Sequence, residues 1–427
     1  MAQYNKQNNQ FLSNGTSLFE VVMLADAEGN INSGGGNFSG AAVDAFGRAR
    51  MSQPVTLFDS TNVGGASDAF YNDITGLGSI QYDNLNSAVN LVITSSATPE
   101  KIVRRSTRRM SYQPGKSLLI LATFTMASAR TGLTQKVGYY DDQDGIYIEK
   151  DENDVYNMVR RHSVLGTIAE ERIPQSQWNG DKLNGIAEDS TSGFTLDLDK
   201  SQISWTDIEW LGVGSVRCGF VINGQFIVAH TFHHANIITG TYMRTASLPV
   251  TYEIETDATY NSGSTSLKQI CCSVISEGGY TSTGLEYAIS TPLSGNSTNN
   301  TGWLNLVTAK LSAEDAIAVI SGIDVINIAN EDFEWGLFRN ATFATPLSFA
   351  GSLGSLAYDT TDINLATTGT RFSGGYLAGK TAPATFGVTN WEYQFTTNAS
   401  GPETYTLAVR ADSQSKSAAG MIKWIEH

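Results

Sequence analysis

The feature that most constrains this chain is an Asn-Gly pair, Asn223-Gly224, between two runs rich in β-branched and aromatic residues. The two runs are Val216–Ile222 and Gln225–His230. A two-residue type I′ turn needs a positive φ at both central positions, and Asn and Gly tolerate that conformation. The sequence therefore predicts a β-hairpin at this point of the chain.

Similar strand-like runs recur about every 10 to 20 residues, with no long amphipathic helical pattern between them. The run Ser117–Met126 is apolar on both faces for several residues, as expected for a strand inside a sandwich. We therefore expect an all-β protein built on an antiparallel, jelly-roll-like β-sandwich rather than a parallel α/β sheet. Further candidate strands are Leu91–Thr94, Val250–Ile254, Gln269–Ile275, Ile323–Ile328, Phe333–Phe338 and Tyr405–Val409.

Shifts in composition divide the chain into three parts. Residues 1–43 are expected to form an extended N-terminal arm, an assembly segment that ends in a Gly-rich linker. Residues 44–289 form the central sandwich and residues 290–427 a smaller C-terminal β domain, because 290–302 are poor in apolar residues and rich in turn formers. Ser312–Ile320 is ambiguous: Ser312 and Asp315 resemble a helix capping box, whereas its β-branched residues favour a strand, which we expect.

Charge and cysteine content exclude several classes of function. The net charge is −15, so binding of nucleic acid over the whole surface is not expected. Three cysteines, two of them adjacent, do not form a disulfide framework, and folding in a reducing cytoplasm is the simplest account. The polar N-terminus lacks the apolar core of a signal peptide, and no apolar stretch of about 18 residues predicts a membrane span.

A basic cluster interrupts this acidic chain: four arginines lie within the segment VRRSTRRM, at Arg104, Arg105, Arg108 and Arg109. Arginine forms bidentate pairs with carboxylates and is common at interfaces. We expect these residues to pair with acidic groups on a neighbouring subunit. The alternative is a solvated strand with arginine on both faces.

Trp178 lies in a polar segment, QSQWNGD, and is the best candidate for an exposed aromatic side chain. An exposed Trp on a sandwich can stack on a sugar ring, so Trp178 is a candidate glycan contact. The alternative, which the segment supports more strongly, is a loop anchor packed against the core.

Two segments resemble metal sites only superficially. His230, His233 and His234 lie close together, but no nearby Cys or carboxylate completes an evident ligand set. The acidic segment Tyr140–Gly145 fails the EF-hand pattern at its first and last positions, and its strand-like flanks favour a hairpin with an acidic tip. A different type of calcium site remains an alternative there, and we expect no metal or cofactor.

The sequence carries no motif of a hydrolase, a nucleotide-binding loop or a dinucleotide-binding fold. Acidic pairs such as Glu170-Glu171 and Glu188-Asp189 are expected on exposed loops. We therefore expect a protein that is not an enzyme. The open alternative is a buried carboxylate pair in a groove between subunits, since glycosidase carboxylates are defined by their spatial separation.

Several segments, in the same order, resemble the virion structural proteins of marine tailed bacteriophages such as cyanophages. The resemblance covers about residues 15–280 well and the C-terminal third weakly. The matching segments are Asp44–Ser60, Tyr112–Ser117, Val137–Asp141 with Asp144–Ile146, Trp178–Asp181 and Trp205–Asn223.

The resemblance implies a structural protein of the virion surface, made in the host cytoplasm, and it brings no catalytic residue. We expect a tail or neck fibre or adhesin, anchored by its N-terminal segment. A capsid-decorating protein, a polysaccharide depolymerase and a free lectin are the alternatives. The expected partners are further copies of the chain, with a trimer the usual solution for phage fibres, other phage structural proteins and a host-surface glycan. Nucleic acid and membrane insertion are not expected.

Overall fold

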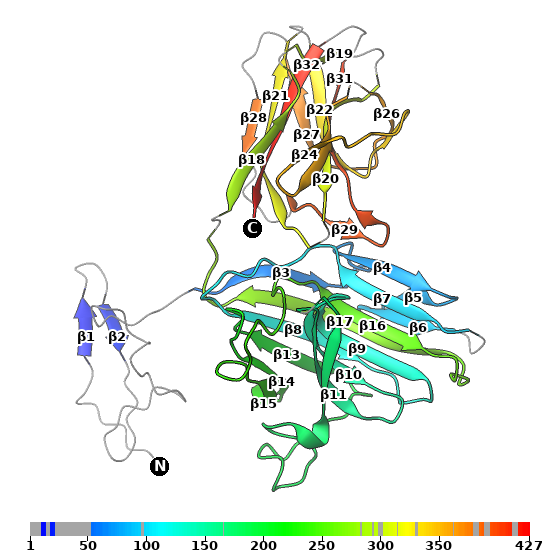
Figure 1. Cartoon of the computed structure of the whole chain (residues 1–427), viewed down its shortest axis with the longest axis vertical. Helices are drawn as coiled ribbons and strands as arrows, with labels where there is room; N and C mark the ends of the chain where they lie inside the picture. The colour runs from blue at the N-terminus through cyan, green and yellow to red at the C-terminus, as the bar shows by residue number, and fades with distance from the viewer. Residues whose placement is uncertain are drawn as a thin grey trace. The chain divides into compact units, whose positions relative to one another are not determined.

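The computed structural model is composed almost entirely of antiparallel β-sheets (Figure 1). It describes residues 10–13, 18–21, 53–94, 98–164, 166–281, 284–292, 294–297, 302–313, 315–328, 332–361, 363–378, 384–387, 393–411 and 417–427. The described helical structure consists of a short 3₁₀ turn, Gln175–Gln177, and a single 3₁₀ residue at Tyr393. The all-β prediction is confirmed. Among the described residues, no helix is long and apolar enough to cross a membrane.

The chain divides into two units, Met1–Gln53 and Pro54–His427. In the first unit, β1 (Gln10–Ser13) pairs with β2 (Leu18–Val21) in an antiparallel ladder. The predicted Gly-rich linker and the predicted boundary at residue 44 lie outside the described residues.

The second unit begins with a sandwich of two sheets. The first, here called the front sheet, has the order β12-β11-β10-β9-β16-β7-β4. Its strands are β12 (Ala169–Pro174), β11 (Tyr156–His162), β10 (Gly145–Lys150), β9 (Leu133–Tyr140), β16 (Val250–Thr256), β7 (Lys101–Ser106) and β4 (Phe70–Thr75). Neighbours such as β9 and β16 are distant in sequence, as expected when strands cross between the sheets of a jelly roll.

The second sheet, here called the back sheet, has the order β15-β14-β13-β8-β17-β6-β5, and β3 pairs with β17. Its strands are β15 (Gln225–Phe232), β14 (Val216–Ile222), β13 (Gln202–Ile208), β8 (Leu118–Thr125), β17 (Thr265–Ser276), β6 (Ala88–Ile93), β5 (Ser79–Asp83) and β3 (Val55–Thr61). The core lies between the two sheets. On β8, for example, Ile120 and Phe124 point into it and alternate with half-buried residues.

The predicted Asn-Gly hairpin is confirmed. Strand β14 ends at Ile222 and β15 begins at Gln225, and these two residues are cross-strand partners. Asn223 and Gly224 have φ values of 51° and 77°, as a type I′ turn requires.

The C-terminal sandwich has its own core, which includes the buried Trp335 and Trp424. One sheet contains β18 (Leu285–Ser290), β32 (Ser417–Glu426), β21 (Ala318–Asn327), β28 (Ala384–Gly387) and β19 (Asn296–Ser297). The other contains β24 (Gly351–Leu353), β25 (Leu356–Asp359), β20 (Leu304–Leu311), β31 (Tyr405–Ala411), β22 (Phe333–Arg339) and β27 (Thr370–Leu377). Two short ladders join β23 (Thr342–Phe343) to β26 (Leu365–Thr367), and β29 (Thr397–Asn398) to β30 (Gly401–Pro402).

One boundary of this sandwich differs from the sequence prediction. Strand β18 pairs with β32, so the boundary between the sandwiches lies before Leu285 rather than at residue 290. The turn-rich segment that suggested the later boundary follows the first strand of the domain. Within the ambiguous segment, Ala318–Ile320 is strand, as expected, and the described residues before it are irregular.

Candidate binding face of the front sheet

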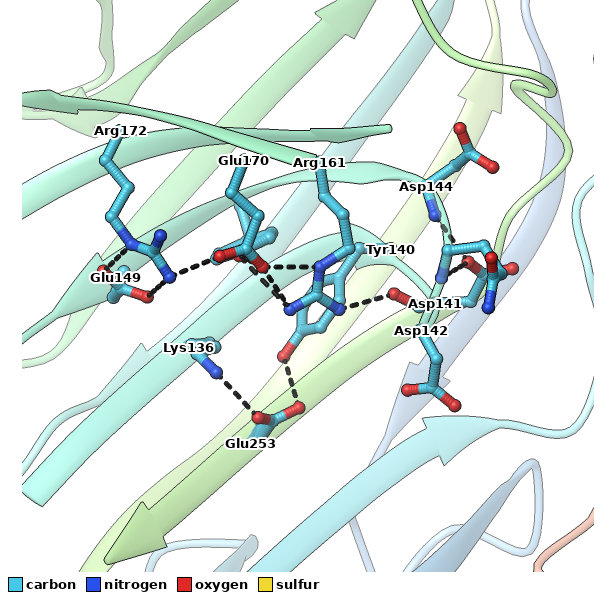
Figure 2. Close-up of polar contacts among 12 residues, drawn as sticks. Lys136, Tyr140, Asp141, Asp142, Asp144, Glu149, Arg161, Glu170, Arg172 and Glu253 are labelled. Atoms are coloured by element: carbon cyan, nitrogen blue, oxygen red, sulfur yellow. Dashed lines mark hydrogen bonds and ion pairs between the residues drawn. The ribbon is translucent and has the colours of Figure 1, made fainter. Parts of the chain in front are cut away.

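The front sheet carries charged and aromatic side chains on the face that points away from the core, here called the polar face (Figure 2). Strand β10 shows the alternation: Ile146 and Ile148 belong to the core, whereas Tyr147 and Glu149 lie on the other face. The polar face comprises Lys101, Arg105, Lys136, Tyr140, Tyr147, Glu149, Arg161, Glu170, Arg172, Glu253 and Glu255.

A buried ion pair occupies the middle of the polar face. Lys136 on β9 and Glu253 on β16 are cross-strand partners, and Lys136 Nζ lies 2.9 Å from Glu253 Oε1. Lys101 Nζ approaches the same oxygen at 3.1 Å, and the Tyr140 hydroxyl donates to Glu253 Oε2 at 3.3 Å. Glu253 is 1% exposed, so its charge is almost fully removed from water.

A second network joins strands β10, β11 and β12. Arg161 Nη2 lies 2.7 Å from Glu170 Oε1, and the Tyr147 hydroxyl donates to the same oxygen at 2.9 Å. Arg172 bridges Glu170 and Glu149, with its Nε 2.9 Å from Glu149 Oε1. The Arg161 guanidinium also lies over the Tyr147 ring at 5.3 Å, a cation–π geometry. Each of these charges therefore has a partner within the sheet (Figure 2).

The arginine cluster is held by contacts within the chain. Arg105 pairs with Asp142 at 2.9 Å, and Arg109 pairs with Asp141 at 2.8 Å. Both aspartates lie in the predicted acidic tip between β9 and β10, so two segments that were interpreted separately pair with each other. The hairpin itself is confirmed. Its tip is closed by Asp141 Oδ1, which accepts the backbone N–H groups of Gln143 and Asp144 at 2.7 and 2.8 Å.

The expected role of Arg104 at a subunit interface is wrong. Arg104 is 1% exposed and bonds to Gln269, Asn72 and the backbone oxygen of Ser67. Arg108 is half-buried, and its guanidinium lies 5.4 Å from the ring centre of Phe58. A role at a subunit interface stays a prediction for Arg105, Arg108 and Arg109.

Trp178 is not an exposed aromatic side chain, so the candidate glycan contact at this position is wrong. Its side chain is 2% exposed, stacks on Phe220 and donates from Nε1 to the Ile173 oxygen at 3.0 Å. The alternative interpretation, a loop anchor packed on the core, describes the residue. The polar residues around Trp178 suggested an exposed loop, but this segment is hydrogen-bonded to strand β15. The backbone N–H groups of Gly180 and Asp181 donate to the Ala229 and Val228 oxygens.

Two of the three clustered histidines, His230 and His234, have separate environments. His230 Nδ1 accepts the Asn179 N–H at 3.3 Å, and burial lowers the pKa of His230 to about 4. His234 donates from Nδ1 to the Gly214 oxygen at 2.6 Å and stacks on Tyr242. Across the described part of the chain, no three His, Cys, Asp or Glu side chains form a group that could hold a metal ion.

The electrostatics of the polar face favour charged carboxylates. Burial alone raises the pKa of Glu253, but Lys136 and Lys101 reverse this and hold it below its usual value. Burial also opposes ionisation of Glu170, and its hydrogen bond from Arg161 outweighs that effect, so the pKa is again lowered. A glycosidase needs one carboxyl group kept protonated by a raised pKa. Glu253 and Glu170 have the opposite shift and behave as fixed charges.

These shifts predict a loss of stability in acid. The folded-state pKa values of Glu253 and Glu170 lie below the ordinary value of 4.5, so the folded state binds fewer protons than the unfolded one. Their contribution is therefore complete above the unfolded-state pKa and is lost as the pH falls through the folded-state values. Urea unfolding between about pH 7 and about pH 3 measures this.

The matched control for the acid experiment is a double variant, Lys136→Met with Glu253→Leu, which removes the buried pair. Its free energy of unfolding should fall less steeply below pH 4.5, the ordinary value of the glutamate, than that of the unaltered chain. Equal slopes in the two proteins would show that the buried pair is not the origin of the acid sensitivity.

No family model matches the chain, and no curated protein matches it. Among solved structures, it is similar to the CBM2 module of the evolved Dit protein of Lactobacillus casei BL23 phage J-1, with 6% identity over 54% of this chain and 100% of that chain, and a TM-score of 0.34. A conserved carbohydrate esterase from the Shiga toxin-encoding bacteriophage phi24B gives 12% identity over 53% and 100%, with a TM-score of 0.30. A glycosyl hydrolase family 16 protein from Mycobacterium smegmatis gives 11% identity over 52% and 100%, with a TM-score of 0.33. At these values the similarities identify neither a ligand nor an activity for this chain.

Proposed function

We propose that this chain is a structural protein of a phage virion, a tail or neck fibre or adhesin that contacts the host surface without catalysing a reaction. The resemblance of Asp44–Ser60 and the other matching segments to virion structural proteins supports placement on the particle. The protein acts there as an oligomer, a trimer in the arrangement usual for phage fibres, with further phage proteins and a host-surface glycan as partners.

The observation that carries the non-catalytic part of the proposal is the pairing of charges on the polar face. Glu253 and Glu170 are each held by two or more partners, and their pKa values are lowered. Such groups stiffen a sheet and keep fixed charges, but they are poor proton donors at neutral pH. This supports surface contact over hydrolysis of a polysaccharide.

The placement on the particle is tested by quantitative mass spectrometry of purified particles of the phage that encodes the chain. We expect tens of copies or fewer per particle. Hundreds of copies per particle would instead assign the chain as a capsid-decorating protein. Absence of the chain from the particles would contradict the virion proposal.

The absence of catalysis is tested by incubating the purified chain with host-surface polysaccharide and measuring new reducing ends. We expect no release above that of heat-denatured protein. Release that is abolished by Glu170→Gln or Glu253→Gln would make the protein a depolymerase and would refute this part of the proposal.

A further inference from the structure

The C-terminal sandwich carries an open pocket of about 640 Å³ on three adjacent strands, β31, β22 and β27. This volume lies in the range of small-ligand sites, roughly 300–1,000 Å³. The side chains that matter for the argument are Asp332, Glu334, Tyr376 and Arg410, all of which line the pocket. We refer to it as the Tyr376 pocket.

Strand register places the central side chains in one row. Glu334 on β22 is the cross-strand partner of Tyr376 on β27 and of Arg410 on β31. Cross-strand partners project to the same face of a sheet. An aromatic ring, a carboxylate and a guanidinium therefore lie side by side at the pocket. Tyr376 is 81% exposed, the highest value for an aromatic side chain in the described residues.

The carboxylate in this row is held from two sides. Arg410 Nε lies 2.5 Å from Glu334 Oε2, and Arg371 pairs with Glu334 Oε1. A Cβ atom on Gly374 would lie 2.1 Å from Arg371 Nη2, so this glycine leaves room for the guanidinium over the sheet. The Trp303 ring lies 5.3 Å from the Arg371 guanidinium and 5.0 Å from that of Arg410. The polar groups beside Tyr376 are thus fixed in position.

We propose that the Tyr376 pocket binds a neutral saccharide unit of a host-surface polysaccharide. The exposed Tyr376 ring offers a flat apolar surface against the C–H face of a pyranose. Glu334 and Arg410 offer an acceptor and donors to its hydroxyl groups. Pre-positioned polar groups lower the ordering cost of binding. The inference rests on the proposed function and names the class of ligand that such an adhesin contacts.

Charge argues for a neutral ligand over an anionic one. Glu334 and Asp332 balance Arg371 and Arg410 at the pocket, and the two guanidinium groups are already paired with Glu334. The whole chain has a net charge of −15, which repels polyanionic polysaccharides at low ionic strength. Among the described residues that line the pocket, no uncompensated positive charge is present to attract a uronate or sulfate group.

Affinity gel electrophoresis of the full chain tests the proposal, with soluble glucan, mannan, galactan and xylan as neutral probes and alginate as the anionic probe. We expect retardation in at least one neutral gel and none in alginate. Tyr376→Ala should weaken the binding about tenfold, equivalent to about 1.4 kcal/mol, whereas Tyr376→Phe should retain it because the ring remains.

Tyr82→Ala is the matched control, because Tyr82 is 38% exposed on strand β5 of the first sandwich, on another sheet. It should bind like the unaltered chain. The proposal that the Tyr376 pocket binds a neutral saccharide would be refuted if no neutral polysaccharide retards the chain. It would also be refuted if the Tyr376→Ala variant binds as tightly as the unaltered chain. That result is separate from failure of the proposed function, which depends on whether the chain is present in the particle.

Discussion

Replacement of Glu253 by alanine is expected to lower the free energy of unfolding by about 3–5 kcal/mol, the usual cost of removing one partner of a buried ion pair. The reason is that Lys136, whose side chain is 7% exposed, loses its buried cross-strand partner and keeps only the more exposed Glu255. Tyr140 also loses an acceptor for its buried hydroxyl group. Urea unfolding at neutral pH measures the change.

Glu255→Ala is the control for this experiment. Glu255 lies two residues further along β16 and also pairs with Lys136 and Lys101, but its side chain is 32% exposed. A more exposed pair of this kind contributes about 0–1 kcal/mol. Similar small losses in the two variants would mean that burial of Glu253 does not increase the contribution of its ion pair to the free energy of unfolding.

Replacement of Trp178 by alanine is the second large effect, an expected loss of about 3–5 kcal/mol in the free energy of unfolding. The indole is 2% exposed and belongs to the core between the two sheets. Its removal leaves a cavity beside Phe220 and an unpaired Ile173 oxygen. Urea unfolding followed by circular dichroism gives the value.

Phe226→Ala serves as the comparison for Trp178, since Phe226 is aromatic, lies on strand β15 and is 55% exposed. Its loss should be under about 1 kcal/mol, as is usual for surface positions. A Trp178→Ala variant of normal stability that has lost affinity for polysaccharide would restore Trp178 as a glycan contact and contradict the structural assignment.

Local features of the fold were predictable from sequence because they depend on neighbouring residues. The Asn223-Gly224 turn and the hairpin around Tyr140–Gly145 are both present. In each, turn formers stand between two strand-like runs, and the turn brings those runs together directly. The all-β class followed from the same signals repeated along the chain.

Burial and long-range pairing were not predictable in this way. Arg104 can be buried because Gln269, 165 residues away in sequence, accepts a hydrogen bond from its guanidinium group. Lys136 and Glu253 are 117 residues apart, so no local pattern signals their pair. The domain boundary was placed too late for a related reason: β18 is fixed by β32, at the opposite end of the domain sequence.

The Tyr376 pocket shows the same dependence on sheet order. Strands β27, β22 and β31 are neighbours in the sheet, although β22 precedes β27 and β31 follows it in sequence. Alternation along Phe333–Phe338 was recognisable, but not which strands would lie on either side. The row of Glu334, Tyr376 and Arg410 exists only once the register is known.

The most direct test of the proposed function is a cryo-EM map of the intact phage particle at side-chain resolution. The two sandwiches should be recognisable in density at the tail or neck, in a small number of symmetric copies. Density over the capsid lattice would instead assign a decorating role. A complete particle map without this fold would contradict the claim that the chain is a structural protein of the virion.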